Sequence, residues 1–173
     1  YEKNKEEVDV CMGMIEKKLE ELGYELPVCP KPVAAYQPAI TFMGKLVYIS
    51  GQDCRKDGEL VHSGKLGEQV TVEEGQECAR QSILNCLAAL KYEIGDLDRV
   101  ERIVKVLGFV ASAPGFGEQP YVINGASELL IHLFGEKGRH ARAALGANEL
   151  PFGTPVEIEM IVELKAHCQE MAV

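Results

Sequence analysis

The sequence predicts an α+β sandwich in which helices cover one face of a β-sheet. Three observations support this fold class. Short apolar runs of strand length follow residue 39, two long helical patterns lie between them, and the last apolar segment alternates strictly. The expected element order is β-β-β-α-β-α-β-β. With 173 residues, of which 46% are hydrophobic and 26% charged, the chain can bury the core of one such domain.

An N-terminal helix is expected before the sheet. Five apolar residues recur there at three- and four-residue steps: Val8, Met12, Ile15, Leu19 and Leu22. Gly23 ends the pattern, and several prolines follow it. We therefore divide the chain into a helix with a Pro-rich linker (1–31), the main domain (32–164) and a C-terminal tail (165–173).

The first half of the main domain is predicted to hold a hairpin and a helix. The runs ITFMG and LVYISG meet at Gly44-Lys45, and GELVHSG is expected to be a weaker third strand after the turn at Asp57-Gly58. Thr71 can cap the helix that follows, which Gly95 ends. The apolar stripe of this helix is Ala79, Ile83, Cys86, Leu87 and Leu90.

The second half is predicted to hold three strands and a helix. RVERIVKVLGFVAS is a long β-branched strand, RHARAALG a short one, and TPVEIEMIVEL the clearest in the chain. Gly135 and Gly138 end the helix between the first two. Its core face is Ile123, Ala126, Leu130, Leu133 and Phe134.

Both faces of this sheet are expected to be covered. In the last strand, Val156, Ile158, Met160, Val162 and Leu164 point to one side, and Glu157, Glu159, Ile161 and Glu163 to the other. The long strand separates Val104, Val106 and Val110 from Ile103, Lys105, Leu107, Phe109 and Ala111. Two helices can cover only one face, so a homo-oligomer is predicted, although a solvated face or cover by the N-terminal helix would also explain the pattern.

Charge and cysteine usage exclude several classes of protein. Lys+Arg is 18 against Asp+Glu 27, a net charge of -9, which disfavours nucleic acid and anionic membranes as partners. No apolar run approaches the roughly 20 residues of a membrane span. The six cysteines show no zinc spacing, so no metal is expected. We expect Cys11, Cys78 and Cys86 to be reduced and buried. The charged N-terminus carries no signal peptide, which favours a cytoplasmic location, with an organellar one as the alternative.

Chemistry-bearing motifs are few. The P-loop, HExxH, GxSxG and GxGxxG are absent, and the four histidines are scattered. Arg142 interrupts a strand of small residues, where a long cation has no packing role. If this strand pairs beside the last one, Arg142 and Glu157 approach each other on the uncovered face, where they could bind a carboxylate and a water. The alternative is an interface salt bridge.

These residues resemble a known family. Ser50-Gly51-Gln52 after a strand, then HARAAL, Leu150-Pro151 and VEIEMIVEL resemble the YjgF/YER057c/UK114 (Rid, endoribonuclease L-PSP) family over residues 32–164. The additional N-terminal helix is similar to that of a divergent branch. The resemblance implies a chorismate-mutase-like fold, a mixed sheet with two helices on one face, assembled as a homotrimer with ligand clefts between subunits.

The resemblance also implies an activity. Family enzymes hydrolyse reactive enamine and imine intermediates, such as 2-aminoacrylate, to 2-keto acids and ammonia without a cofactor. By this resemblance Arg142 binds the substrate carboxylate, Glu157 positions water, and Ala144, where the family often has cysteine, contacts the ligand through its backbone. Further cleft positions match Ser50, Tyr36 and Asn124.

Two other functions remain as alternatives. One is a non-catalytic, small-molecule-binding or chaperone-like trimer that uses the same cleft. The other is the ribonuclease or translation inhibitor of the L-PSP label. Net charge and an aromatic content of 6% disfavour the latter, because RNA binding relies on basic grooves and stacking rings.

Overall fold

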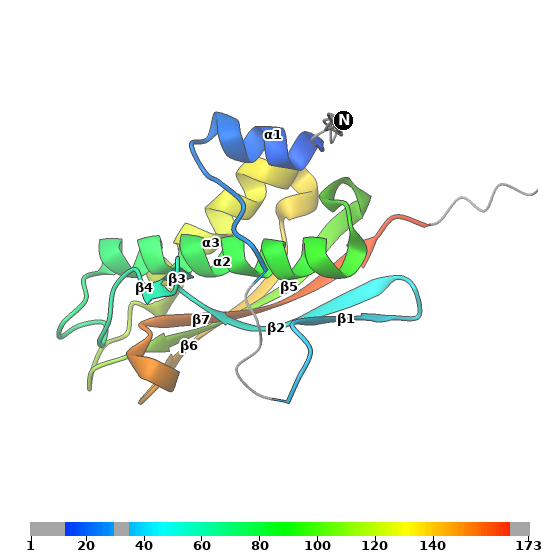
Figure 1. Cartoon of the computed structure of the whole chain (residues 1–173). Helices are drawn as coiled ribbons and strands as arrows, with labels where there is room; N and C mark the ends of the chain where they lie inside the picture. The colour runs from blue at the N-terminus through cyan, green and yellow to red at the C-terminus, as the bar shows by residue number, and fades with distance from the viewer. Residues whose placement is uncertain (1–12, 30–34, 167–173) are drawn as a thin grey trace, which may run out of the picture.

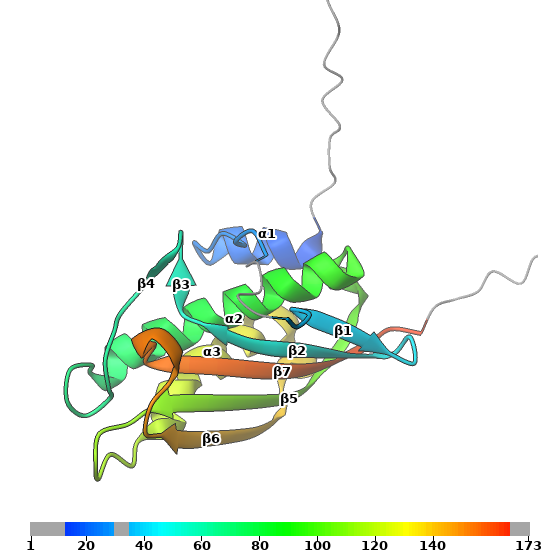
Figure 2. The ribbon, with the colours of Figure 1, turned by 60° about the horizontal axis from the view of Figure 1, so that its bottom comes forward.

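The computed structural model describes residues 13–29 and 35–166. Five strands form one sheet in the order β1-β2-β7-β5-β6 (Figure 2). Their bounds are β1 Ala39–Phe42, β2 Leu46–Asp53, β5 Val100–Ala111, β6 Ala141–Ala147 and β7 Val156–Leu164. Neighbouring strands are antiparallel except β5 and β6, which are parallel and joined through a helix. The predicted mixed sheet is therefore confirmed.

Two helices, α2 (Val72–Ile94) and α3 (Gln119–Phe134), cover one face of the sheet (Figure 1). Thr71 caps α2 as predicted: its hydroxyl accepts the Glu74 amide, and the Glu74 carboxylate accepts the Thr71 amide in return. Gly95 ends the helix with a φ of 84°, which favours glycine. Short 3-10 turns at Leu97–Arg99, Gly135–Gly138 and Pro151–Gly153 link the elements.

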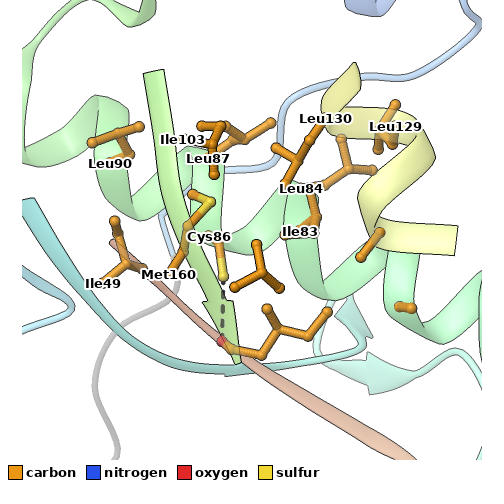
Figure 3. Close-up of a cluster of buried hydrophobic side chains, with 14 of the residues drawn as sticks. Ile49, Ile83, Leu84, Cys86, Leu87, Leu90, Ile103, Leu129, Leu130 and Met160 are labelled. Atoms are coloured by element: carbon orange, nitrogen blue, oxygen red, sulfur yellow. Dashed lines mark hydrogen bonds between the residues drawn. The ribbon is translucent and has the colours of Figure 1, made fainter. Parts of the chain in front are cut away.

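The core lies between these helices and the sheet. Figure 3 shows Leu87 and Leu90 of α2, Leu130 of α3 and Met160 of β7 among its side chains. The Cys86 thiol donates a 3.4 Å hydrogen bond to the Ile158 carbonyl oxygen, drawn as a dashed line (Figure 3). The alternation predicted for the last strand is confirmed, because all five of its inward residues are buried.

Two strand predictions need correction. GELVHSG does not extend the main sheet: its residues Glu59–Leu60 form β4, which pairs only with β3 (Arg55–Lys56) around the turn at Asp57-Gly58. In β5, a bulge between Ile103 and Lys105 shifts the register, so Ile103 is buried together with Val106 and Val110. A bulge adds one residue to a strand and reverses the alternation beyond it.

The N-terminal helix packs on the helical layer. Helix α1 (Met14–Glu21) lies over α3 and buries Ile15 and Leu19 (Figure 1). Lys18 Nζ donates a 3.0 Å hydrogen bond to the Leu133 carbonyl oxygen. The helix therefore does not cover the other sheet face. Val8 and Met12, which the helical pattern includes, lie outside the described residues, as does Cys11.

The second sheet face, which we call the open face, carries apolar side chains in the single chain. Ile40 is 59% exposed, Phe42 56%, Tyr48 45% and Leu145 50%. The described α-helices α1, α2 and α3 all lie on the other side of the sheet (Figure 1). The homo-oligomer that would cover it stays a prediction.

Two further expectations concern the cysteines and membrane-spanning helices. Cys78 and Cys86 are buried free thiols, as predicted, and so is Cys54. Within the described ranges, none of the helices combines the length and hydropathy that a bilayer span needs.

Candidate functional site

A pocket opens where β2 ends and β7 begins, near the Pro151–Gly153 turn. We call it the acidic pocket. Its volume is about 520 Å³, and its lining is Tyr36, Ser50, Gly51, Gln52, Asp53, Arg55, Pro151, Phe152, Glu157 and Glu159. This lining includes three carboxylates and one guanidinium. The structure thus brings together Tyr36, Ser50 and Glu157, three of the residues expected from sequence.

A bulge in β2 shapes this pocket. Ile49 pairs with Met160 but Gln52 pairs with Ile158, so β2 has one residue more than β7 in this interval. The additional residue lies at Ser50-Gly51, between these two pairs. A Cβ atom at Gly51 would lie 2.9 Å from Glu157 Cδ and 3.2 Å from its Cγ. The Glu157 side chain thus occupies the space that a larger residue at position 51 would need, and it would have to move to admit one.

Ser50 holds the loop that carries Tyr36. Its hydroxyl donates a 2.7 Å hydrogen bond to the Gln37 carbonyl oxygen, and its amide donates to Pro38 over 2.9 Å. Tyr36 follows in the same loop and is partly exposed at the pocket. Ser50 thus acts through backbone contacts that set the pocket wall.

Glu157 is half-buried in the pocket. Burial raises the pKa of its carboxyl, and the negative charges of Asp53 and Glu159 add to this effect. Asp53 lies directly opposite Glu157 on the neighbouring strand. A carboxyl with a raised pKa can exchange protons nearer to neutral pH, which suits a general acid or base.

Asp53, Arg55 and Phe152 also line the pocket, and sequence reasoning missed them. Arg55 forms an ion pair with Asp53 and lies 4.9 Å from the centre of the Phe152 ring. Phe152 has a φ of 59°, which is unfavourable for a non-glycine residue. Asp53 directly follows the Ser50-Gly51-Gln52 motif and Arg55 comes two residues later, and this closeness to the motif is the signal that could have identified them.

A second group of polar residues surrounds Arg142 on β6. We call it the arginine cluster: Asn124, Ser127, His140 and Arg142. Arg142 NH1 donates to Asn124 Oδ1 over 2.9 Å and to Ser127 Oγ over 3.1 Å, and NH2 donates to the Pro120 carbonyl oxygen over 3.3 Å. Asn124, expected from sequence, therefore does contact Arg142. A guanidinium has five N–H donors, so two more can bind a ligand.

His140 supports the arginine cluster and was not expected from sequence. Its Nδ1 lies 2.6 Å from the Gly138 carbonyl oxygen and its Nε2 lies 3.0 Å from Ser127 Oγ. Burial lowers the pKa of His140, and the positive charge of Arg142 lowers it further. A neutral imidazole can then accept the Ser127 hydroxyl proton while Ser127 accepts from Arg142.

The arginine cluster and Glu157 lie on opposite faces of the sheet. Strand β5 separates β6 from β7, so the expected pairing of the Arg142 strand beside the last strand is wrong. In the β5 register Arg142 stands opposite the buried Val106, on the helix-covered face, whereas Glu157 stands opposite Phe109 on the open face. Two strand spacings amount to about 10 Å.

Ala144 lies two residues beyond Arg142 on the same face of β6. It stands opposite Gly108 and packs against the core. Of the described residues, a group with metal-ligand spacing is formed by Glu16, Asp96 and Asp98. None of these three lines the acidic pocket or belongs to the arginine cluster.

Comparison with known proteins identifies relatives over most of the chain. A family model described as "YjgF/chorismate mutase-like, putative endoribonuclease" matches residues 16–167. Protein TCP17 of Trypanosoma cruzi is 43% identical over 156 residues, which cover 90% of this chain and 97% of that protein.

Solved structures agree with this match. Atu1372 of Agrobacterium tumefaciens, a protein of unknown function, is 46% identical with a TM-score of 0.82, covering 88% of this chain and 93% of that one. A "putative endoribonuclease" from Shewanella oneidensis is 33% identical with a TM-score of 0.83, covering 87% and 99%. The resemblance seen in the sequence is confirmed: the chain belongs to the YjgF/chorismate mutase-like family.

Proposed function

We propose that the protein is a homotrimeric, cofactor-free hydrolase that converts reactive enamine and imine intermediates to 2-keto acids and ammonia. The observation that carries the proposal is the division of the expected site residues into two groups. The acidic pocket and the arginine cluster lie on opposite faces of one sheet and carry opposite charge. In this proposal the acidic pocket and the arginine cluster are each one half of a catalytic site.

Assembly would join the two halves. A closed ring of identical subunits sets one surface of each subunit against a different surface of the next. The exposed apolar side chains of the open face supply a reason for association. In such a ring, the arginine cluster of one subunit meets the acidic pocket of its neighbour, and a cleft between subunits then contains both Arg142 and Glu157.

Arg142 would bind the carboxylate of the substrate. Its contacts with Asn124 and Ser127 fix the guanidinium plane and leave Nε and one NH2 hydrogen for a carboxylate. This places the reacting carbon at a fixed distance from the neighbouring pocket. Positioning of this kind accounts for a large part of enzymatic rate enhancement.

Glu157 would position the water and move the protons. The enamine takes a proton at carbon and becomes an imine. Water adds to the C=N carbon, and the C–N bond breaks as nitrogen is protonated, which releases ammonia and leaves a C=O group. One water is consumed and no electrons are transferred. A carboxyl with a raised pKa can receive the proton from water and return it to nitrogen.

The test measures ammonia release from imino acids that an amino acid oxidase generates in the assay. We expect Arg142→Ala to lower the rate about a hundredfold or more, because the substrate loses its anchor. Glu157→Gln is expected to lower it by roughly a hundredfold to ten-thousandfold. Arg139→Ala and Glu136→Gln are matched controls, since these two residues form an exposed ion pair with each other outside the two half-sites.

Mixed trimers test the division between subunits. Arg142→Ala and Glu157→Gln subunits, inactive alone, are co-refolded in equal amounts. In each mixed trimer one interface combines an intact Arg142 with an intact Glu157, so about a quarter of wild-type activity should return. Absence of complementation, with mixed trimers present by mass spectrometry, contradicts a shared site. Saturable keto-acid binding by the wild type without turnover contradicts the enzymatic proposal.

Ribonuclease activity fits these half-sites poorly. The acidic pocket places Asp53, Glu157 and Glu159 together, and the net charge is -9. RNA phosphates would meet like charge there, whereas RNA binding requires basic surfaces. RNA cleavage that Arg142→Ala removes would overturn this argument.

A further inference from the structure

Three carboxylates meet where α1 docks on the turn between α2 and β5. Glu16 comes from α1, and Asp96 and Asp98 come from the turn. One oxygen from each lies within 4.8 Å of the other two. Two oxygens bound to one Ca²⁺ ion at 2.3–2.6 Å are at most about 5 Å apart, so the separation suits a shared cation.

Glu16 supplies an independent observation. The residue is only 8% exposed, and its Oε2 atom is buried without a hydrogen-bond partner among the described residues. Its other oxygen accepts from Lys91 Nζ at 2.8 Å. A buried carboxylate oxygen without a partner is costly, and each native example requires an explanation.

Gly13 shows where this oxygen points. A Cβ atom at Gly13 would collide with Glu16 Oε2, and it would lie 3.3 Å from Asp96 Oδ1 and 3.4 Å from Asp98 Oδ2. Gly13 has an extended backbone that other residues also adopt, so a turn conformation does not explain the glycine. Its missing side chain leaves the space around which the three oxygens converge.

The existing hydrogen bonds leave these oxygens able to bind an ion. Asp98 accepts the amides of Met14 and Ile15 at 2.8 and 3.0 Å, and Asp96 Oδ1 accepts the Asp98 amide at 2.9 Å. Each carboxylate oxygen has a second acceptor position. Lys91 neutralises only one of the three negative charges, so a doubly charged cation would balance the group.

We propose that Glu16, Asp96 and Asp98 form a Ca²⁺ site that fastens the N-terminal helix to the core. Carboxylate oxygens are ligands of hard cations, and the absence of sulfur and imidazole from the three side chains disfavours zinc. Ca²⁺ tolerates irregular oxygen geometry, whereas Mg²⁺ demands a near-ideal octahedron. The ion would join α1 to the turn that starts β5, two elements far apart in the chain.

Titration calorimetry of the EDTA-treated full chain with CaCl2 tests the site. We expect saturable binding of Ca²⁺, weaker binding of Mg²⁺, and a Tm that rises with Ca²⁺ concentration. Asp96→Asn keeps the oxygen that accepts the Asp98 amide but removes charge, and should weaken Ca²⁺ binding at least about tenfold. Glu20→Gln, an exposed change on the same helix, is the control and should leave affinity unchanged.

The Gly13→Ala variant and hydrogen exchange test the Ca²⁺ site independently of Asp96→Asn. The added methyl group fills the space between the oxygens, so this variant should also bind Ca²⁺ more weakly. Amides of α1 in the wild type should exchange more slowly with Ca²⁺ than with EDTA. No heat and no Tm change up to about 10 mM Ca²⁺ would overturn the proposal, as would wild-type affinity in Asp96→Asn or preference for Mg²⁺.

Discussion

The two faces of β7 have different chemistry within a single strand. On the helix-covered face, Val156, Ile158, Met160, Val162 and Leu164 are fully buried by the chain itself. On the open face, Glu157, Glu159, Ile161 and Glu163 keep partial exposure. The comparison teaches that one face builds the core of the chain, whereas the other adds little to the core and is free for the proposed partner and ligand. Substitutions on the two faces should therefore separate stability from assembly and activity.

Leu107→Glu should have the largest effect on the open face. Leu107 lies on β5 opposite Glu159, so a second carboxylate there places like charges together at the predicted interface. We expect the trimer to dissociate and imine hydrolysis to fall to background. Sedimentation velocity and the ammonia assay measure both.

Tyr92→Glu is the control for Leu107→Glu. Tyr92 is exposed on α2, on the other side of the molecule, and its substitution should change neither measurement. A Leu107→Glu protein that remains trimeric and active would show that the open face is not the interface.

Leu130→Ala should have the largest effect on the covered face. Leu130 is fully buried in the core of Figure 3, and a Leu→Ala change in a core costs about 2–5 kcal/mol. Urea denaturation measures this loss. Tyr48→Ala, on the open face, should lower the free energy of unfolding of the isolated chain much less. Equal losses for the two variants would contradict the different roles of the two faces.

Gly51→Ala should lower activity more than stability. The new methyl group would displace the Glu157 side chain, because it would lie 2.9 Å from Glu157 Cδ. A displaced general acid or base costs on the order of a hundredfold in kcat. The KM for the imino acid should change little, since Arg142 is untouched. A wild-type kcat would show that Glu157 need not occupy this position.

Glu157→Gln should have a small, pH-dependent effect on stability. Burial, with the charges of Asp53 and Glu159, raises the pKa of Glu157 in the folded chain. The folded chain therefore holds this proton more firmly than the unfolded chain does. Stability from this group is present below the unfolded pKa and is lost as the pH rises through the folded pKa.

Glutamine does not ionise, so Glu157→Gln should have a higher Tm than the wild type at neutral pH. The difference should shrink as the pH falls toward about 4. Thermal melts across this range give the comparison. A difference that grows on acidification would contradict the direction of the pKa shift.

The sequence predicts the layers of the fold well. The alternation in β7 and the apolar stripe of α2 are each set by residues within a single element. Both predictions are confirmed. The hairpin at Gly44-Lys45 and the capping residue Thr71 are equally local features. The short β4 and the bulge in β5 could not be predicted, because a single additional residue reverses a strand's alternation without a clear sequence signal.

Prediction of the candidate site was limited by topology. Arg142 and Glu157 stand on strands whose neighbours are decided by tertiary structure, and β5 lies between them. Asn124 and Ser127 come one helical turn apart on α3, so their approach to Arg142 depends on how α3 packs beside β6. In the sequence, Gly51 stood out only as part of the Ser50-Gly51-Gln52 motif. In the structure, the Glu157 side chain occupies the space that a side chain at Gly51 would need.

Strand β6 ends the sheet, and its outer edge has consequences for handling the protein. The strand is mostly alanine and glycine, with Arg142 as its one charged residue. Exposed edges with few charges readily pair with other extended chains, which is a common origin of aggregation. No strand of the described residues pairs with this outer edge, so concentrated preparations of the single chain should be prone to precipitate.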